Sequence, residues 1–203
     1  MKLCHAPASP FARKVRVCAE ELGIPLTLET VQVAPTQPNR DFADAVNPLR
    51  KIPALVTDDG EALYDSTVIC LYLDARAGGG KLLPAEGPGR WRMLTAHALA
   101  NGMTEAAVTI RYESVVRPEP QRWQAWIDDQ MDRIWAGLDW FERHPEARAG
   151  ATPDLAQIAL GCLLGYLDFR FADCGWRARC PAVADWYATM RTRPSFQRSE
   201  PGG

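Results

Sequence analysis

The spacing of apolar residues changes partway along this chain of 203 residues, and the change limits the folds open to it. Up to about residue 73, short stretches that alternate like strands are separated by stretches with helical spacing. Beyond residue 90 only helical spacing is found, and all seven tryptophans lie there. The segment between, ARAGGGKLLPAEGPGR, is dense in glycine and proline, as linkers are. The sequence therefore predicts two domains, residues 1–80 and 87–203, with a boundary near residues 78–88.

The first half predicts short elements in the order β-α-β-α-β-β-α. Gly23 and the turn DDG are stop signals between them. Because strands joined through a helix need a crossover connection, the first strands should pair in parallel, and the hairpin should add an antiparallel edge. The expected strands are MKLCH, PLTLETVQV, IPALVTD and EALY, and the expected helices are PFARKVRVCAEELG, RDFADAV and DSTVICLYLDARAGG.

The second half predicts a bundle of helices. Residues 89–116 form a long helix with Gly102 inside it, where a kink or a close contact is expected. Residues 119–144 form another. Residues 154–171 are apolar on nearly all sides, which predicts the buried central helix, and they open on the capping-box spacing DLAQ. A last helix lies in AVADWYATMRTRPSF and is expected to end at Pro194.

Composition indicates an ordinary globular protein of the cytosol. The net charge of −2 gives no footprint for nucleic acid or an anionic membrane. No window approaches the 18 apolar residues of a spanning helix, and the N-terminus lacks the apolar run of a signal peptide. The six cysteines show neither a C-x-x-C pair nor metal-type spacing, so buried free thiols and no metal site are expected.

Ser9, in the stretch HAPASPFARKVRVC, directly precedes a proline at the start of a predicted helix. A serine at the N-cap followed by proline at the first helical position is favourable capping chemistry. A helix N-terminus also favours an anion, because its N–H groups are unpaired and carry partial positive charge. The residues alone leave two interpretations open: a helix cap, or a hydroxyl that acts on something bound at the helix end.

Three local patterns, together with the order of elements, resemble the cytosolic glutathione S-transferases. SPFARKVR resembles the segment that opens the family's first helix, where serine, cysteine or tyrosine chemistry handles the glutathione thiol. NPLRKIPAL resembles the stretch that ends in the family's cis-proline, here Pro53, and LYDSTVICLYL resembles its acidic residue and serine pair. The resemblance runs along essentially the whole chain. It implies an α/β thioredoxin-like N-terminal domain and an all-α C-terminal helical bundle.

The serine-type bacterial branch of the family fits best. Theta-like classes place their serine one residue earlier, where this chain has Ala8, and Ser9 matches the omega-type cysteine of a C-P-F motif. Only the thiolate of glutathione attacks electrophiles well, and lowering a thiol pKa by about two units takes about 2.7 kcal/mol. A charge-assisted hydrogen bond is worth about 1.5 to 3 kcal/mol. The resemblance thus implies Ser9 as the catalytic residue.

The resemblance also implies which residues bind glutathione, the co-substrate. Ile52, beside Pro53, pairs with the cysteinyl backbone. Asp65 and Ser66 hold the γ-glutamyl ammonium and carboxylate, although capping of the third helix explains both equally well. Arg50 and Lys51 are candidates for the glycyl carboxylate, with solvated loop cations as the alternative. Val33, after the second strand, lines the same site.

The function implied is activation of the glutathione thiolate for attack on a small hydrophobic electrophile. One alternative is glutathione-dependent reduction of disulfides or peroxides, which would favour a cysteine at position 9. Another is a non-catalytic, glutathione-binding stress or regulatory protein.

A homodimer is expected, with the helix DSTVICLYL of one subunit against the long helices of the other. The acceptor pocket is expected between the domains, with candidate lining residues His97, Asn101, Met103, Glu105, Ile110 and Tyr112.

Overall fold

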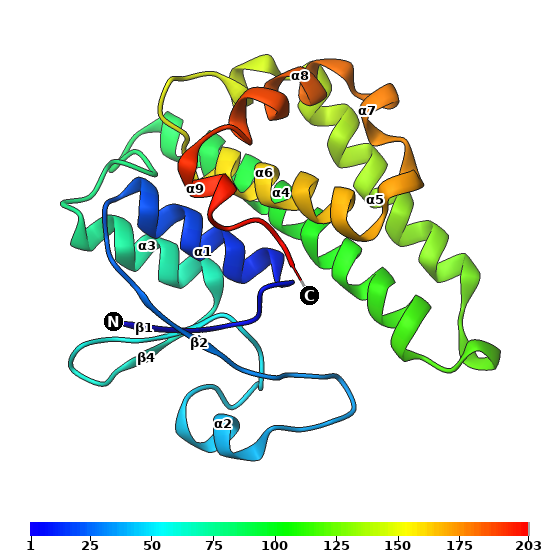
Figure 1. Ribbon diagram of the computed structural model, residues 1–203. Helices are drawn as coiled ribbons and strands as arrows, with labels where there is room; N and C mark the ends of the chain where they lie inside the picture. Colours follow the sequence, from blue (N-terminus) through cyan, green and yellow to red (C-terminus); the bar gives the residue numbers. More distant parts are fainter. Residues whose placement is uncertain (203) are drawn as a thin grey trace. The chain divides into compact units, whose positions relative to one another are not determined.

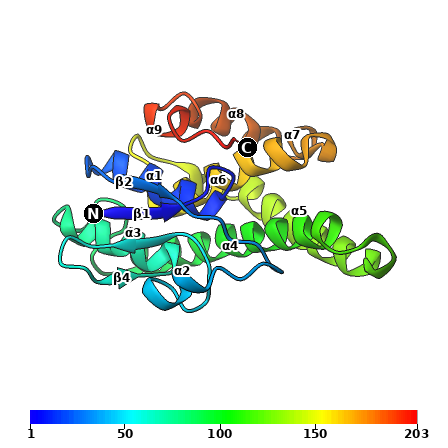
Figure 2. The same cartoon turned by 60° about the horizontal axis from the view of Figure 1, so that its bottom comes forward.

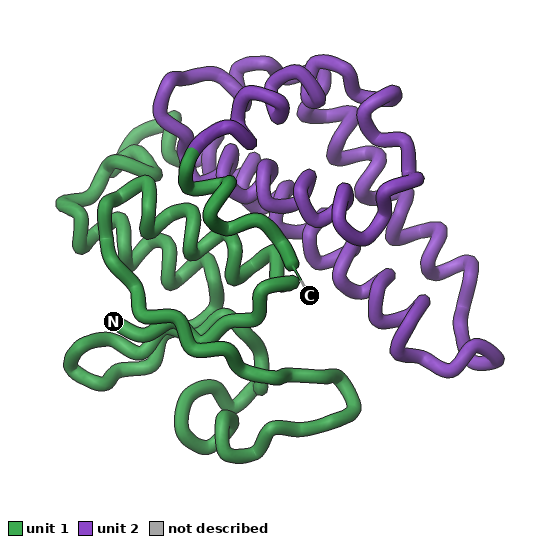
Figure 3. Tube along the Cα trace, viewed as in Figure 1, with its two compact units in different colours: residues 1–90, 194–203 green, residues 91–193 purple. Residues whose placement is uncertain are grey.

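The computed structural model describes residues 1–202 and divides into two compact units. The first unit joins Met1–Arg90 to the C-terminal segment that begins at Pro194, and the second is Trp91–Arg193 (Figure 3). Segments from the two ends of the chain therefore share the first unit. The domain ranges 1–80 and 87–203 remain a prediction, which did not anticipate that residues from Pro194 onward join the first unit.

A mixed sheet of four strands organises the first unit. The strands are β1 (Lys2–His5), β2 (Thr27–Thr30), β3 (Ala54–Val56) and β4 (Ala62–Leu63), in the order β2-β1-β3-β4. β1 and β2 pair in parallel, whereas β3 pairs antiparallel with both β1 and β4. The expected parallel start and antiparallel hairpin are confirmed.

Helices cover both faces of this sheet (Figures 1 and 2). α1 (Pro10–Glu21) and α3 (Ser66–Arg76) pack together on one face, and α2 (Arg40–Ala45) lies on the other. α1 buries Val15 and Cys18 as its helical spacing predicts, but it also buries the charged Arg13 and Lys14. On the opposite face, a small core made from Cys4, Val31, Phe42 and Ala54 anchors α2. The predicted thioredoxin-like arrangement of strands and helices is confirmed.

The regular elements of the second unit, Trp91–Arg193, are all helices. α4 (Pro88–Arg111) continues into a short π-helical turn (Tyr112–Val116), and α5 (Gln124–Arg143) follows. α6 (Leu155–Arg170) is buried from Leu155 to Leu167, as its apolar sequence predicts. Its N-terminus has the expected capping box, in which Asp154 accepts from the Gln157 N–H at 2.9 Å and Gln157 accepts from the Asp154 N–H at 3.3 Å. Shorter elements complete the unit: Glu119–Gln121, Pro145–Arg148, Ala172–Cys174, α7 (Trp176–Arg179) and α8 (Pro181–Met190).

Two details of the helical half differ from expectation. Of the kink or close contact expected at Gly102, the close contact is not found, because a Cβ there would meet nothing within 4 Å; the kink stays a prediction. The close approach is at Gly137 of α5, where a Cβ would overlap the Met103 side chain of α4. Pro194 does not end the last helix: α8 stops at Met190, and Pro194 opens α9 (Pro194–Gln197), since proline fits a first helical position.

No single helix among residues 1–202 is both long and apolar enough to cross a membrane. One bent pair, Leu155–Arg170 with Ala172–Arg179 at 102°, meets the requirements of length and composition alone. The α6 part of that pair is the buried core helix of the second unit.

Candidate functional site

Strand register brings four loops of the first unit to one edge of its sheet. Cys4 of β1 lies opposite Ala54 of β3, so the end of β1 adjoins the start of β3. Leu55 lies opposite Leu63, which puts the end of β4 at this edge too, and His5 lies beside Thr30 at the end of β2. The predicted site residues all follow or precede these strand ends: Ser9 after β1, Val33 after β2, Arg50, Lys51, Ile52 and Pro53 before β3, and Asp65 and Ser66 after β4.

Ser9 is the N-cap of α1. Its extended backbone (φ −80°, ψ 117°) lets the hydroxyl oxygen accept from the Ala12 N–H at 3.2 Å, and Pro10 occupies the first helical position. The Ser9 N–H donates to the Ala6 carbonyl at 3.0 Å, which fixes the loop after β1. A hydroxyl accepts through its lone pairs and donates through its proton, so capping does not use up the donor. The two interpretations of Ser9 are therefore compatible.

Asp65 is the N-cap of α3, at a helix start that differs chemically from that of α1. One carboxylate oxygen, Oδ1, accepts from the N–H groups of Thr67 at 2.9 Å and Val68 at 3.3 Å. The residue is exposed, while Ser66, the first residue of the helix, is only 2% exposed. The cap bonds involve Oδ1 alone among the carboxylate oxygens, so an exposed anionic oxygen is presented at the start of α3.

Asn47 holds the loop that carries four of the predicted residues. Its buried side chain donates to the Lys51 carbonyl at 2.8 Å and accepts from the Leu49 N–H at 3.0 Å. Arg50 has a left-handed backbone with φ 55°, and its N–H donates to the Asn47 carbonyl at 2.8 Å. Sequence reasoning missed Asn47 as a site-supporting residue. The signal was the Asn-Pro pair, since asparagine side chains often bond the backbone two residues on.

The same loop ends in the predicted cis-proline. The Ile52–Pro53 peptide is cis, which confirms that prediction, and Pro53 is buried while Arg50 and Lys51 are exposed. Ile52 and Val33 are both partly buried against the core cluster of Cys4, Val31, Phe42 and Ala54. Two residues nineteen positions apart in the chain thus share one apolar support at the site edge.

His5, at the end of β1, is a buried titratable group in this region. Burial, and next the positive charge of Arg16, lower the pKa of His5 below its usual value. Its Nδ1 has no hydrogen-bond partner in the described structure. A histidine held neutral in this way adds no positive charge to the region at neutral pH.

The states of the cysteines and the placement of histidine and acidic side chains bear on two other chemistries, thiol–disulfide exchange and metal binding. All six cysteines are free thiols; five are buried and Cys174 is partly so. Within residues 1–202 no group of three histidine, cysteine or acidic side chains could hold a metal ion. Position 9 is serine, so a cysteine-based exchange reaction would have to use a thiol that is not at the helix start.

The candidates on α4 mostly belong to the core of the second unit. His97, Met103 and Ile110 are each less than 5% exposed. Asn101 donates to Glu105 at 3.3 Å along the helix surface, and Tyr112 is exposed. Ordinary bundle packing, the plainer explanation, therefore accounts for the three buried residues.

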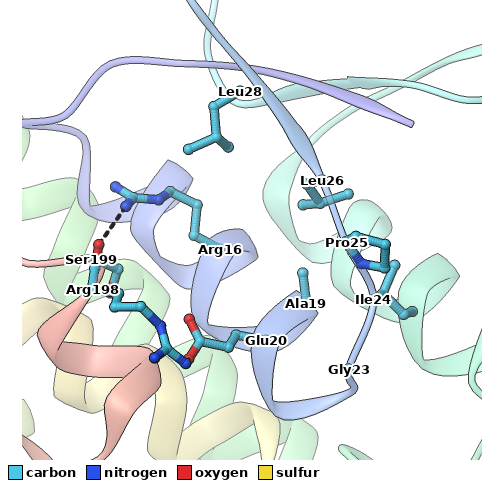
Figure 4. Close-up of a pocket in the computed structure, with 10 residues that line it drawn as sticks. All are labelled: Arg16, Ala19, Glu20, Gly23, Ile24, Pro25, Leu26, Leu28, Arg198 and Ser199. Atoms are coloured by element: carbon cyan, nitrogen blue, oxygen red, sulfur yellow. Dashed lines mark hydrogen bonds and ion pairs between the residues drawn. The ribbon is translucent and has the colours of Figure 1, made fainter.

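One cavity in each unit can be described from its lining residues. One of 590 Å³ lies beside the C-terminal end of α1 and is lined by Arg16, Ala19, Glu20, Gly23, Ile24, Pro25, Leu26, Leu28, Arg198 and Ser199 (Figure 4). One of 440 Å³ lies between α4 and α5 and includes Gly102. Neither is lined by Ser9, Asp65 or the loop that precedes β3, so neither of these two cavities marks the predicted site.

Comparison with known proteins matches both units. The family model for the glutathione S-transferase N-terminal domain covers residues 3–81, and that for the C-terminal domain covers residues 124–189. The chain belongs to the glutathione S-transferase family. It is 33% identical to the uncharacterised GST-like protein YibF of Escherichia coli, over 99% of this chain and 98% of that protein.

Solved glutathione transferases share the whole fold. A family member from Pseudomonas fluorescens, crystallised with bound glutathione, is 43% identical, with a TM-score of 0.93 over 100% of this chain and 99% of that one. A glutathione S-transferase from Methylobacillus flagellatus, also with glutathione bound, is 38% identical, with a TM-score of 0.88 over 99% of both chains. The family and fold implied by the three sequence motifs are confirmed.

Proposed function

We propose that this family member is a glutathione transferase that activates the glutathione thiolate for attack on a small hydrophobic electrophile. The observation that carries the proposal is the meeting of Ser9, Ile52, Pro53, Asp65 and Ser66 at one edge of the sheet. Relatives with this fold were crystallised with glutathione bound. The convergence of a helix N-terminus, a loop with exposed cations and an exposed carboxylate suits a small zwitterionic peptide.

Each part of glutathione has a proposed partner at this edge. The exposed carboxylate of Asp65 attracts the γ-glutamyl ammonium, and the start of α3 with Ser66 binds the γ-glutamyl carboxylate. The backbone of Ile52, before Pro53, pairs with the cysteinyl residue. Arg50 and Lys51 approach the glycyl carboxylate, and Val33 lines the site.

In the proposed reaction, Ser9 donates its hydroxyl proton in a hydrogen bond to the sulfur of glutathione. The thiol proton leaves to solvent, because the thiolate is stabilised by this bond and by the N–H groups of α1. The thiolate then attacks a carbon of the electrophile, so a carbon–sulfur bond forms and the leaving group departs with its electron pair. A hydrogen bond of about 1.5 to 3 kcal/mol supplies much of the 2.7 kcal/mol that a thiol pKa lower by about two units takes.

Turnover across a panel of electrophiles tests this function. Glutathione binding is measured by calorimetry. Conjugation is followed with aryl halides and epoxides, and reduction is followed with disulfides and hydroperoxides. Conjugation of at least one carbon electrophile, slowed in Ser9→Ala, supports the proposal. Reduction of disulfides or peroxides alone would replace it with the reductase alternative, and binding without any turnover would favour a non-catalytic protein.

We further propose that the protein is a homodimer. Val68 is 46% exposed on α3 and Tyr64, just before it, is 37% exposed, which leaves apolar surface at that helix. The 440 Å³ cavity between α4 and α5 has a mixed lining, in which apolar residues such as Leu99, Ala106 and Trp126 lie beside polar ones such as Glu105 and Arg133, and it offers a second surface to a partner. Light scattering should give twice the chain mass at micromolar concentration, and a monomer would contradict the proposal.

The cytosol is the proposed location. Six free thiols without a disulfide are typical of a reducing compartment, where glutathione is also kept reduced. Fractionation of cells that express the full chain, with alkylation of thiols before lysis, tests this location. Recovery from an oxidising compartment with paired cysteines would contradict it.

A further inference from the structure

Arg13 is a buried cation in the helix that starts at Ser9. Its side chain is 3% exposed, and it lies one turn beyond the N-cap of α1. Nε donates to the Ser199 hydroxyl at 3.4 Å, Nη2 donates to the Phe196 carbonyl at 3.0 Å, and the guanidinium lies 5.3 Å from the Phe196 ring centre. These partners are all neutral, and Nη1 has none in the described structure. No ion pair to Arg13 is found among residues 1–202.

The C-terminal segment keeps this charge away from water. The Ser199 hydroxyl donates to the Ser195 carbonyl at 2.6 Å, and Arg16 donates to the Arg198 carbonyl at 2.8 Å (Figure 4). Arg198 pairs with Glu20, and Ser195 donates to Glu21 at 2.5 Å. These contacts hold residues 195–199 against the side of α1 that carries Arg16, Glu20 and Glu21. Buried charges are normally paired, so a buried arginine with only neutral partners is unusual.

The charged groups around Arg13 make the first part of α1 positive. No acidic residue lies in the first turn of the helix, and its two glutamates, Glu20 and Glu21, lie at the far end. His5 on β1 is held neutral, as described above. The other charged groups on the elements that pack around this helix are Lys14 and Arg16 on α1 itself, Lys2 on β1, Asp65, Asp74 and Arg76 at α3, and Arg198 and Glu200 in the C-terminal segment.

We infer that the buried charge of Arg13 stabilises the thiolate of glutathione at the N-terminus of α1, and that residues 195–199 keep that charge desolvated. Arg13 lies one helical turn after Ser9, so its charge belongs to the half of α1 that is nearer the proposed thiolate site. A charge shielded from water acts over a longer distance than an exposed one. Arg13 would not touch glutathione, and it acts on the sulfur through space. The inference rests on the proposed function.

Replacing the neutral partner of Arg13 with a charged one is the sharpest test. Ser199→Asp puts a carboxylate next to Nε and neutralises the guanidinium where it stands, and Ser199→Asn is the matched neutral control. The thiolate absorbance of the glutathione complex is titrated with pH. The expected result is a thiol pKa about one unit higher in Ser199→Asp and unchanged in Ser199→Asn. Coincident curves for the two variants would overturn the inference.

Variants of Arg13 itself distinguish the effect of its charge from the effect of its packing and hydrogen bonds. Arg13→Met is expected to raise the thiol pKa by about one unit, while Arg13→Lys keeps the charge and the low pKa, even with an earlier thermal transition. Equal shifts in both variants would mean that Arg13 only fastens the C-terminal segment, and the inference would fall. Should Arg13→Met not fold, the Ser199 pair decides alone. A wild-type protein that binds no glutathione would instead refute the proposed function, a result that these variants do not produce.

Discussion

The helices α1 and α3 begin at the same edge of the sheet, yet their caps carry different charges. α1 starts at Ser9, a neutral hydroxyl, with no acid in its first turn and its two glutamates at the far end. α3 starts at Asp65, a carboxylate that bonds two backbone N–H groups with one oxygen. A neutral cap leaves the positive end of a helix available to an anion, whereas an acidic cap offsets it and attracts a cation. This difference supports the proposal that the sulfur of glutathione binds at α1 and its ammonium group at α3.

A third helix start shows what capping looks like without a ligand. α6 begins at Asp154, which is half-buried and bonded to Gln157 in a closed capping box. Its carboxylate is occupied within its own helix. A side chain of the same type as Asp65 therefore has a purely structural role when it is enclosed.

The largest effect is expected at Asp65. Asp65→Ala should weaken glutathione binding by about 2 to 3 kcal/mol, because a contact to a charged group is lost. Asp65→Asn keeps an oxygen for the cap, so it should lose similar affinity while its thermal stability stays near wild type. Calorimetry and thermal melts measure the two quantities. If Asp65→Asn binds as well as wild type, or if Ser9→Ala loses as much affinity as Asp65→Ala, the γ-glutamyl assignment is wrong.

Ser9→Ala should change ionisation rather than affinity. The loss of one charge-assisted bond of about 1.5 to 3 kcal/mol raises the thiol pKa in the glutathione complex by roughly one to two units. Some lowering should survive, because the backbone N–H groups from Phe11 onward remain. Thiolate absorbance, titrated from acid to alkaline pH, measures it. Should the curves coincide while the variant melts earlier, Ser9 is only a cap.

The smallest effect is expected at Asp154, and it depends on pH. Burial raises the pKa of Asp154 above 3.8, against the opposing hydrogen bonds from Gln157 and Ala156. An acid whose pKa is raised by folding binds its proton more tightly in the folded state, so stability falls as pH rises from its unfolded value through its folded value. Asp154→Asn keeps a cap oxygen and avoids this loss.

Thermal melts across a pH series test this behaviour. The Asn variant should be more stable than wild type by at most about 1 kcal/mol at neutral pH, with the advantage gone below the unfolded pKa of the acid. Glutathione affinity should not change. A wild type that is the more stable of the two at neutral pH would show that the charge at the helix start outweighs the cost of burying it.

Local chemistry made much of the fold and site predictable. Caps at Ser9, Asp65 and Asp154 involve bonds over two or three residues, so the sequence around each contains what is needed to infer them. Apolar spacing identified the strands, the buried helix α6 and the hairpin for the same reason. The alternation in PLTLETVQV predicted a strand, but only Thr27–Thr30 pairs with β1, because strand length depends on the partner.

What the sequence by itself determined is the two-part order of elements, the helix starts and the motifs of the glutathione S-transferase family. Only the tertiary structure decided which distant groups meet: Gly137 against Met103, and Arg13 against Ser199, 186 residues away. The physical reason is the distance along the chain over which each interaction acts. Periodicity and capping depend on neighbours within a turn or two, whereas the close approach of helices and the burial of a charge depend on surfaces brought together by packing of the whole chain.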